Sequence, residues 1–110
     1  MKEYQHDPVL LSEVIKYLNI KKKKVYLDGT LGGGGHSEAI LKKKGKVLAL
    51  EVDKAGREYS RKRLKKYSHN LLIKNKSYIH LADVVEEYNL KISGIILDLG
   101  LSSYHLEQSK

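Results

Sequence analysis

The run of four glycines from Gly32 to Gly35 constrains this chain more than any other feature. It follows a short apolar segment, residues 25–27, and precedes residues 38–43, which have the composition of a helix. A strand, a glycine turn and a helix N-terminus together expose backbone N–H groups, and glycines leave room for a ligand to reach them. Because glycine loses much chain entropy on folding, a purely structural turn rarely uses four in succession. The pattern favours a nucleotide or nucleoside site over its alternative, a flexible surface loop.

The composition is that of one small domain without disulfides. The chain has 110 residues, of which 41% are hydrophobic, enough for a packed core. The absence of cysteine excludes disulfides, thiolate catalysis and cysteine-based zinc sites, and it is typical of intracellular proteins. No apolar run reaches membrane-spanning length and the polar start does not resemble a signal peptide. We therefore expect a cytoplasmic protein without a membrane partner.

Lysine makes the chain strongly basic. There are 21 Lys and Arg residues against 13 Asp and Glu residues, and the formal net charge is +8. Such a balance favours polyanions, nucleic acid above all, although it also keeps a small domain soluble. The basic clusters at residues 21–24, 42–44 and 61–66 fall where loops and helix ends are expected. The charge alone is therefore only weak support for RNA binding.

Helical and strand patterns alternate along the chain. Helices are predicted at residues 8–18, 38–43, 55–66 and 79–88, and strands at residues 24–27, 46–51, 71–73 and 93–99. We expect Gly45 to end the second helix in the C′ position, and the third strand to be buried. The inner sides of the last two helices are expected to carry Tyr59, Leu64 and Tyr67, and Ile79, Ala82, Val85 and Tyr88. This alternation predicts an α/β fold with a mostly parallel sheet of about four strands.

Three of the predicted strands end in an acid. In an open parallel sheet, ligands bind outside the carboxyl ends of the strands, where Asp28, Glu51 and Asp98 are expected. Glu51 follows the first loop glycines by about 20 residues, the separation at which an acid binds ribose hydroxyls. Asp98 lies among apolar residues, and a buried charge there requires a partner. Glu51 and Asp98 could also have purely structural roles at the ends of their strands. His36 could likewise only cap or pack against the start of the helix.

Two cofactors suit a glycine loop followed by a ribose-binding acid: NAD and S-adenosylmethionine. The NAD fingerprint places Gly or Ala at its third site, where this chain has Ser37 or Glu38. S-adenosylmethionine carries no phosphate but does carry an ammonium group, which Asp28 would suit. The residues therefore favour the methyl donor, with an NAD-binding oxidoreductase half-domain as the alternative. No metal cluster or nucleophilic triad is present in the sequence.

Three motifs resemble successive signatures of the ribosomal RNA small subunit methyltransferase H (RsmH/MraW) family. The resemblance runs in the right order from about His6 to the last residue, and the G-G-H-S and D-L-G-x-S-S motifs are far more specific than a glycine loop alone. It implies a Rossmann-like methyltransferase that transfers a methyl group from S-adenosylmethionine to N4 of a cytidine in 16S rRNA of the small ribosomal subunit. The motifs are His6-Asp7-Pro8-Val9-Leu10-Leu11-Ser12-Glu13-Val14, Asp28-Gly29-Thr30-Leu31-Gly32-Gly33-Gly34-Gly35-His36-Ser37 and Gly94-Ile95-Ile96-Leu97-Asp98-Leu99-Gly100-Leu101-Ser102-Ser103.

The resemblance also implies the residues that bind the cofactor. The ribose would be bound by Glu51, where the family usually has Asp, and the adenine would lie beside an aromatic residue after the third strand. That position is Ser77 or Tyr78, and we choose Tyr78 because a ring can stack on the base. His105 falls where the family often has Gln. The full implied set is Gly34, Gly35, His36, Glu51, Tyr78, Asp98 and His105.

The chain is short for this family. After the fourth predicted strand only residues 101–110 remain, too few for another βα unit. We expect residues 1–110 to be the N-terminal part of the methyltransferase domain, without its remaining strands and its inserted helical region that helps to bind RNA. No catalytic residue is assigned, and an inactive truncated remnant is a further alternative.

Overall fold

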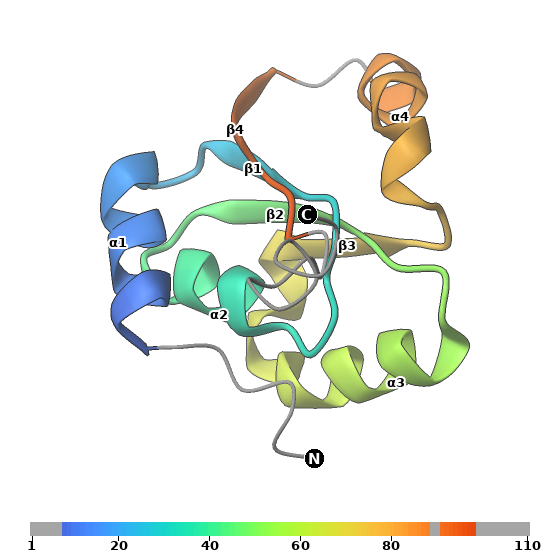
Figure 1. The fold of residues 1–110 in the computed structure, drawn as a ribbon, viewed down its shortest axis with the longest axis horizontal. Coiled ribbons are helices and arrows are strands. Elements are labelled where there is room, and N and C mark those ends of the chain that lie inside the picture. Colours follow the sequence, from blue (N-terminus) through green and yellow to red (C-terminus); the bar gives the residue numbers. More distant parts are fainter. Residues whose placement is uncertain (1–7, 89–90, 99–110) are drawn as a thin grey trace, which may run out of the picture.

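A computed structural model describes residues 8–88 and 91–98 (Figure 1). Helices and strands alternate as the sequence predicts, and most predicted boundaries are correct to within two residues. The largest differences, of three residues each, are an earlier start of the second helix, an earlier end of the third helix and an earlier end of the last strand. The elements are α1 (Pro8–Leu18), β1 (Val25–Asp28), α2 (Gly35–Lys42), β2 (Lys46–Leu50), α3 (Lys54–Arg63), the 3₁₀ helix η2 (Lys65–Asn70), β3 (Leu71–Lys74), the 3₁₀ helix η3 (Tyr78–His80), α4 (Leu81–Tyr88) and β4 (Ile92–Ile96).

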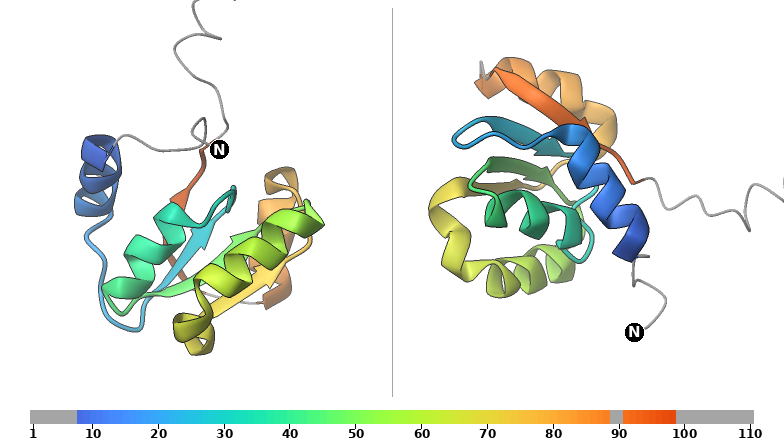
Figure 2. Two further views of the ribbon diagram at one scale, coloured as in Figure 1. Left: turned by 90° about the horizontal axis from the view of Figure 1, so that it is seen from below. Right: turned by 90° about the vertical axis from the view of Figure 1, so that its left-hand side faces the viewer.

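The four strands form one parallel sheet in the order β3-β2-β1-β4. The chain builds outward from β1 to β3 and then returns past β1 to add β4 on its other side. Right-handed crossovers therefore place α2 and α3 on one face and α4 on the other, as Figures 1 and 2 show. The strand order reverses between β1 and β4, and this switch point is where an open α/β sheet binds its ligand.

The two faces of the sheet bury cores of different size. The larger core lies under α1 and α2 and includes Tyr26, Ile40 and Leu64. The smaller core lies under α4 and consists of Leu27, Leu48, Leu50 and Val84. The register extends this second face as a row of residues across the sheet, Leu72-Leu48-Leu27-Ile95. The inner two members are buried, whereas Leu72 and Ile95 are about half exposed because β3 and β4 are the edge strands. The prediction that the third strand is buried is thus wrong for Leu72.

Gly45 does not end α2 in the way that the sequence predicts. The N–H of Lys44 donates to the carbonyl of Leu41 and the N–H of Gly45 to that of Ile40, at 2.9 and 3.1 Å, which is a Schellman motif. Lys44 therefore occupies the C′ position, with a φ of 72°. Glycine is needed at position 45 for close packing, because a Cβ there would lie 2.8 Å from Ile40 Cγ2.

Some predicted inner residues face solvent. Tyr59 and Ile79 are 58% and 70% exposed, and Ala82 is also exposed. Helix α3 ends at Arg63 and turns its buried Ser60 toward the glycine loop, so Tyr59 points outward. Residue 79 belongs to the 3₁₀ helix η3, whose phase differs from that of α4, and Val84 becomes the buried centre of α4. The inward positions of Leu64, Tyr67, Val85 and Tyr88 are confirmed.

Candidate functional site

The glycine loop joins β1 to α2 at the carboxyl edge of the sheet. Gly32 and Gly34 have φ angles of 53° and 91°. Residues other than glycine adopt this left-handed backbone conformation only at a cost in free energy. The N–H of Gly34 donates to the carbonyl of Leu31 at 2.8 Å, and α2 begins at the next residue. The loop therefore needs glycine at two positions for its backbone path, and it presents a helix N-terminus beside the switch point.

Two residues of α3 donate hydrogen bonds to the backbone carbonyls of the glycine loop. Ser60 Oγ donates to the carbonyl of Gly32 at 3.1 Å, and Arg63 Nη1 donates to the carbonyl of Gly33 at 2.7 Å. Arg63 also forms an ion pair with Glu38 of α2, with 2.7 Å between Nη2 and Oε1. Sequence reasoning missed Ser60 and Arg63, because their partners are backbone carbonyls about 30 residues away that no local pattern marks.

Asp28 is buried at the end of β1, and its carboxylate is hydrogen-bonded to residues on both sides of the four-glycine run. Its carboxylate accepts a hydrogen bond from the Thr30 N–H at 3.2 Å and from the Ser37 hydroxyl at 2.7 Å. Burial raises the pKa of the Asp28 carboxyl, although these two hydrogen bonds and the nearby charge of His36 act in the opposite direction. The expectation that Asp28 faces a ligand's ammonium group is not met, because its side chain lies inside the fold.

Glu51 connects the end of β2 to the same loop. Its Oε1 accepts a hydrogen bond from the Gly32 N–H at 2.9 Å, and its Oε2 accepts one from the Asp53 N–H at 3.1 Å. Arg57 donates to the backbone carbonyl of Glu51 at 3.0 Å. The carboxylate is half-buried and oriented beside the glycines, and its remaining lone pairs can accept from a diol.

The ends of β1 and β4 meet at the switch point. The N–H of Gly29 donates to the carbonyl of Ile96 at 2.9 Å, and the N–H of Asp98 donates to Thr30 Oγ1 at 2.6 Å. A side chain at position 29 would collide with Leu97. The Asp98 side chain is exposed, so the expectation of a buried charge was wrong: β4 is an edge strand, and its carboxyl end opens to solvent.

Tyr78 and Ser77 have different surroundings after β3. Ser77 is the N-cap of η3, and its Oγ accepts a hydrogen bond from the Ile79 N–H at 3.3 Å. Tyr78 is 39% exposed, and its Cβ lies 3.5 Å from the position that a Cβ on Gly29 would occupy. Tyr78 therefore lies beside Gly29, whereas the Ser77 hydroxyl caps the start of η3.

The structure brings most of the predicted site residues to one edge. Gly34, Gly35 and His36 form the loop and the first turn of α2, with the His36 side chain buried. Glu51, Tyr78 and Asp98 follow β2, β3 and β4 at the same edge. His105 lies outside the described residues. Within residues 8–88 and 91–98, no three His, Asp or Glu side chains are grouped to hold a metal ion, and no helix has the length and apolarity to cross a membrane.

Similar solved structures identify the class of fold. The C-terminal domain of precorrin-6Y C5,15-methyltransferase from Rhodobacter capsulatus superposes with a TM-score of 0.74 at 13% identity, covering 96% of this chain and 56% of that one. An rRNA methylase from Streptococcus thermophilus gives a TM-score of 0.66 at 20% identity, covering 93% and 60%. The chain has the Rossmann-like fold of the S-adenosylmethionine-dependent methyltransferases, as predicted.

Sequence relatives then identify the family. Residues 3–110 match the model of the MraW methylase family, and the chain belongs to that family. Ribosomal RNA small subunit methyltransferase H of Clostridium botulinum is 44% identical over 97% of this chain and 36% of its own length. The protein of the same name from Dictyoglomus thermophilum is 41% identical over 94% of this chain and 36% of its length. The chain thus spans about 36% of the length of these curated relatives.

Proposed function

We propose that this chain is the cofactor-binding part of an S-adenosylmethionine-dependent methyltransferase that acts on N4 of a cytidine in 16S rRNA. Its partner would be the small ribosomal subunit. Support comes from its family and from relatives named as ribosomal RNA small subunit methyltransferase H. The observation that carries the proposal is the hydrogen bond between Glu51 and the glycine loop at the switch point of the sheet.

The residues at the carboxyl edge suit a nucleoside with a cationic amino acid tail. Glu51 would accept hydrogen bonds from the two ribose hydroxyls, and Tyr78 would lie against the adenine. The loop from Gly34 to His36 would enclose the methionine part. His105 remains a predicted contact. The acid at position 51 disfavours a cofactor with a phosphorylated ribose, since like charges repel.

S-adenosylmethionine supplies an electrophilic methyl group when it is bound. The N4 amine of cytosine is a weak nucleophile because its lone pair is delocalised into the ring, so the target must be aligned and its developing positive charge stabilised. Asp98 is exposed beside the switch point, and its carboxylate is the charge that this chain would present toward the target. We assign no catalytic base among these residues.

Methyl transfer tests the proposal. The 110-residue chain and a fusion of it to the remaining part of the Clostridium botulinum relative would be incubated with tritiated S-adenosylmethionine and small ribosomal subunits. We expect the fusion to methylate 16S rRNA at cytidine N4, as located by nuclease digestion and mass spectrometry. We expect no transfer by the chain alone, since it spans 36% of the relative's length.

A matched fusion carrying Glu51→Ala should lose most of the transfer, whereas one carrying Glu58→Gln on the exposed side of α3 should keep it. The proposal would be contradicted if the unsubstituted fusion methylated a different nucleobase atom, or if it methylated only an RNA other than 16S rRNA.

A further inference from the structure

Lysines collect at the amino-terminal edge of the sheet, opposite the candidate site. One group precedes β1 and the other surrounds the start of β2, and the backbone joins them: the Lys23 N–H donates to the Lys44 carbonyl at 3.0 Å, and the Lys46 N–H to the Lys24 carbonyl at 2.8 Å. The loop before β1 projects at the left of the right-hand panel of Figure 2. We call this surface the lysine patch; it comprises Lys21, Lys22, Lys23, Lys24, Lys43, Lys44 and Lys46.

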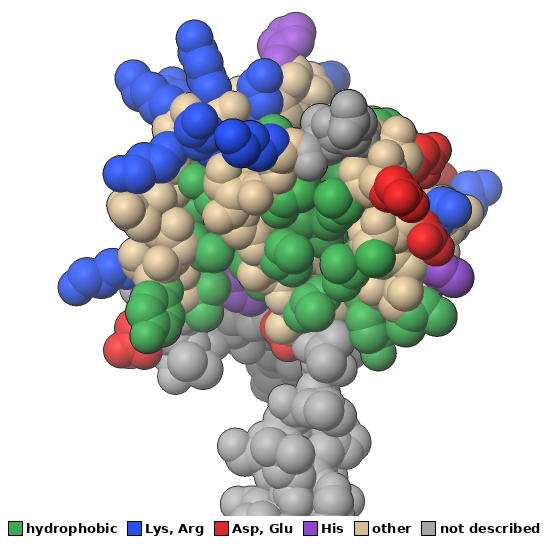
Figure 3. All heavy atoms as spheres, turned by 90° about the horizontal axis from the view of Figure 1, so that it is seen from above, with side chains coloured by type: hydrophobic (Ala, Val, Ile, Leu, Met, Phe, Trp, Pro, Cys, Tyr) green, Lys and Arg blue, Asp and Glu red, His purple; other side chains and the backbone are tan. Residues whose placement is uncertain are grey.

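The charges of the lysine patch are not neutralised within the fold. All seven side chains are exposed, and in the part of the chain that the structure describes none of them forms an ion pair. Basic side chains gather at the upper left of Figure 3, whereas the acids lie mainly at its right. The patch therefore produces a positive potential that is available to a polyanion.

Two patch lysines are held in a backbone conformation that lysine does not favour. Lys23 and Lys44 have φ angles of 67° and 72°, in the left-handed region where glycine and asparagine are the usual residues. Both side chains are exposed to solvent. The chain thus keeps a positive charge at two positions where an uncharged residue would stabilise the fold, which points to a role for the charge.

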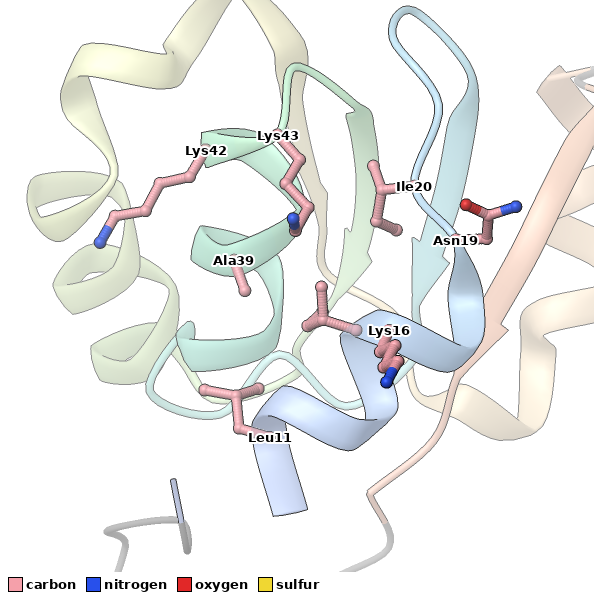
Figure 4. Close-up of a pocket in the computed structure, with 8 residues that line it drawn as sticks. Leu11, Lys16, Asn19, Ile20, Ala39, Lys42 and Lys43 are labelled. Carbon is pink, nitrogen blue, oxygen red and sulfur yellow. The ribbon is translucent and has the colours of Figure 1, made fainter. Parts of the chain in front are cut away.

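A groove between α1 and α2 continues the patch along the face of the molecule. It has a volume of about 630 Å³, and its apolar lining includes Leu11, Ile15 and Ile20. Lys16 of α1 and Lys43, the residue after α2, also line it (Figure 4). None of its eight lining residues is aromatic. Because the groove offers no ring on which a base can stack, the contacts expected along it are those of ammonium groups with phosphates.

We infer that the lysine patch is a second RNA-binding surface, which contacts the phosphate backbone at a distance from the cofactor site. The choice of RNA as the polyanion rests on the proposed function. The patch lies at least ~13 Å from the carboxyl edge, since β1 alone spans four residues. Lysine–phosphate contacts position an RNA without reading its sequence, so the patch would hold rRNA outside the methylated nucleotide.

A charge-matched pair of variants tests this inference. Lys23→Asn with Lys44→Asn removes two patch charges at positions where asparagine relieves backbone strain, so the variant is expected to melt no lower than wild type. Arg61→Gln with Lys62→Gln removes two exposed charges from α3 and serves as the control. The affinity of the 110-residue chain for a single-stranded 20-nucleotide RNA would be measured across salt concentrations, alongside its affinity for S-adenosylhomocysteine.

We expect the patch variant to lower the slope of log affinity against log salt by about 1.4 and to weaken RNA binding at least about tenfold at 0.1 M salt. The control should change the slope by much less, and both variants should bind S-adenosylhomocysteine as wild type does. Equal losses in the two variants, no RNA binding by wild type, or tighter binding to phosphatidylserine vesicles than to RNA would overturn the inference. Patch-dependent RNA binding in a chain that does not bind S-adenosylhomocysteine would support this surface while contradicting the proposed cofactor.

Discussion

The two edges of the sheet differ in how they use charge. At the carboxyl edge, Asp28 and Glu51 accept hydrogen bonds from the glycine loop, and Arg63 binds the loop from α3. At the amino edge, the lysines of the patch are exposed and have no acidic partner among the residues that the structure describes, and two of them have a left-handed backbone. A parallel sheet places all strand ends of one kind together, so the same four strands present a pre-organised polar site on one side and a bare cationic surface on the other.

Removing the carboxylate of Glu51 is expected to have the largest effect on the carboxyl edge. Glu51→Ala should weaken S-adenosylhomocysteine binding at least about 100-fold, because two hydrogen bonds to a charged group are lost and the Gly32 N–H loses its partner. Calorimetric titration measures this, and Glu58→Gln on α3 is the control because that side chain is exposed and forms no hydrogen bond with the loop. Unchanged affinity in Glu51→Ala would remove this residue from the site.

The backbone of the loop provides the next largest effect. Gly34→Ala should destabilise the fold by about 1–2 kcal/mol, because φ is 91° and the new Cβ would lie 3.4 Å from Leu64 Cδ1 and Ser60 Oγ. Gly33→Ala is the matched control, since its nearest neighbour would be Arg63 Nη1 at 3.8 Å and its φ is not positive. Urea unfolding compares the two; equal stabilities would show that the loop conformation is not held as described.

Asp28→Asn should change the pH dependence of stability. Burial raises the pKa of the Asp28 carboxyl in the folded state, so the folded chain retains this proton more strongly than the unfolded chain does. The stability of wild type should therefore decline relative to the variant as pH rises from about 3.8 through the folded-state pKa, because the carboxyl must ionise while buried. The asparagine amide can keep both hydrogen bonds, with Ser37 as acceptor. Unfolding measured from pH 4 to pH 8 checks this, and a variant that loses stability relative to wild type with rising pH would contradict it.

The smallest effect is expected at the amino edge, where a substitution should raise the stability of the fold instead of lowering it. Lys44→Gly should stabilise the fold by about 0.5 kcal/mol, since relief of the left-handed conformation exceeds the added chain entropy. Lys43→Gly, at a C-cap residue with a φ of −91°, should instead destabilise it by about 0.5–1 kcal/mol. Thermal unfolding of both variants measures the contrast, and a loss of stability in Lys44→Gly would show that the lysine there is favoured for the fold itself.

Most of the fold follows from the local sequence. Apolar runs bounded by glycine, lysine and acids predict all four strands, and their alternation with helices predicts a parallel sheet. The errors arise where tertiary position decides: Leu72 is exposed because β3 is an edge strand, and Tyr59 is exposed because α3 turns Ser60 toward the loop. The sequence predicts Gly45 at the C′ position after α2, but Lys44 occupies that position in the structure.

The candidate site is predictable only in part for a similar reason. The glycines, Glu51 and Asp98 stand at strand ends and are marked by their type and spacing. Ser60 and Arg63 are not, because they act on carbonyls 28 and 30 residues away in the chain. The inward orientation of Asp28 depends on Ser37, which is brought to it only when α2 folds back over β1.

Calorimetric titration of the 110-residue chain with S-adenosylhomocysteine and, separately, with NAD tests most directly whether the carboxyl edge is a methyl-donor site. We predict saturable binding of S-adenosylhomocysteine, at one site per chain, that is abolished or strongly weakened by Glu51→Ala, and no binding of NAD. Binding of NAD without binding of S-adenosylhomocysteine would contradict the proposed cofactor and favour a dinucleotide-binding half-domain instead.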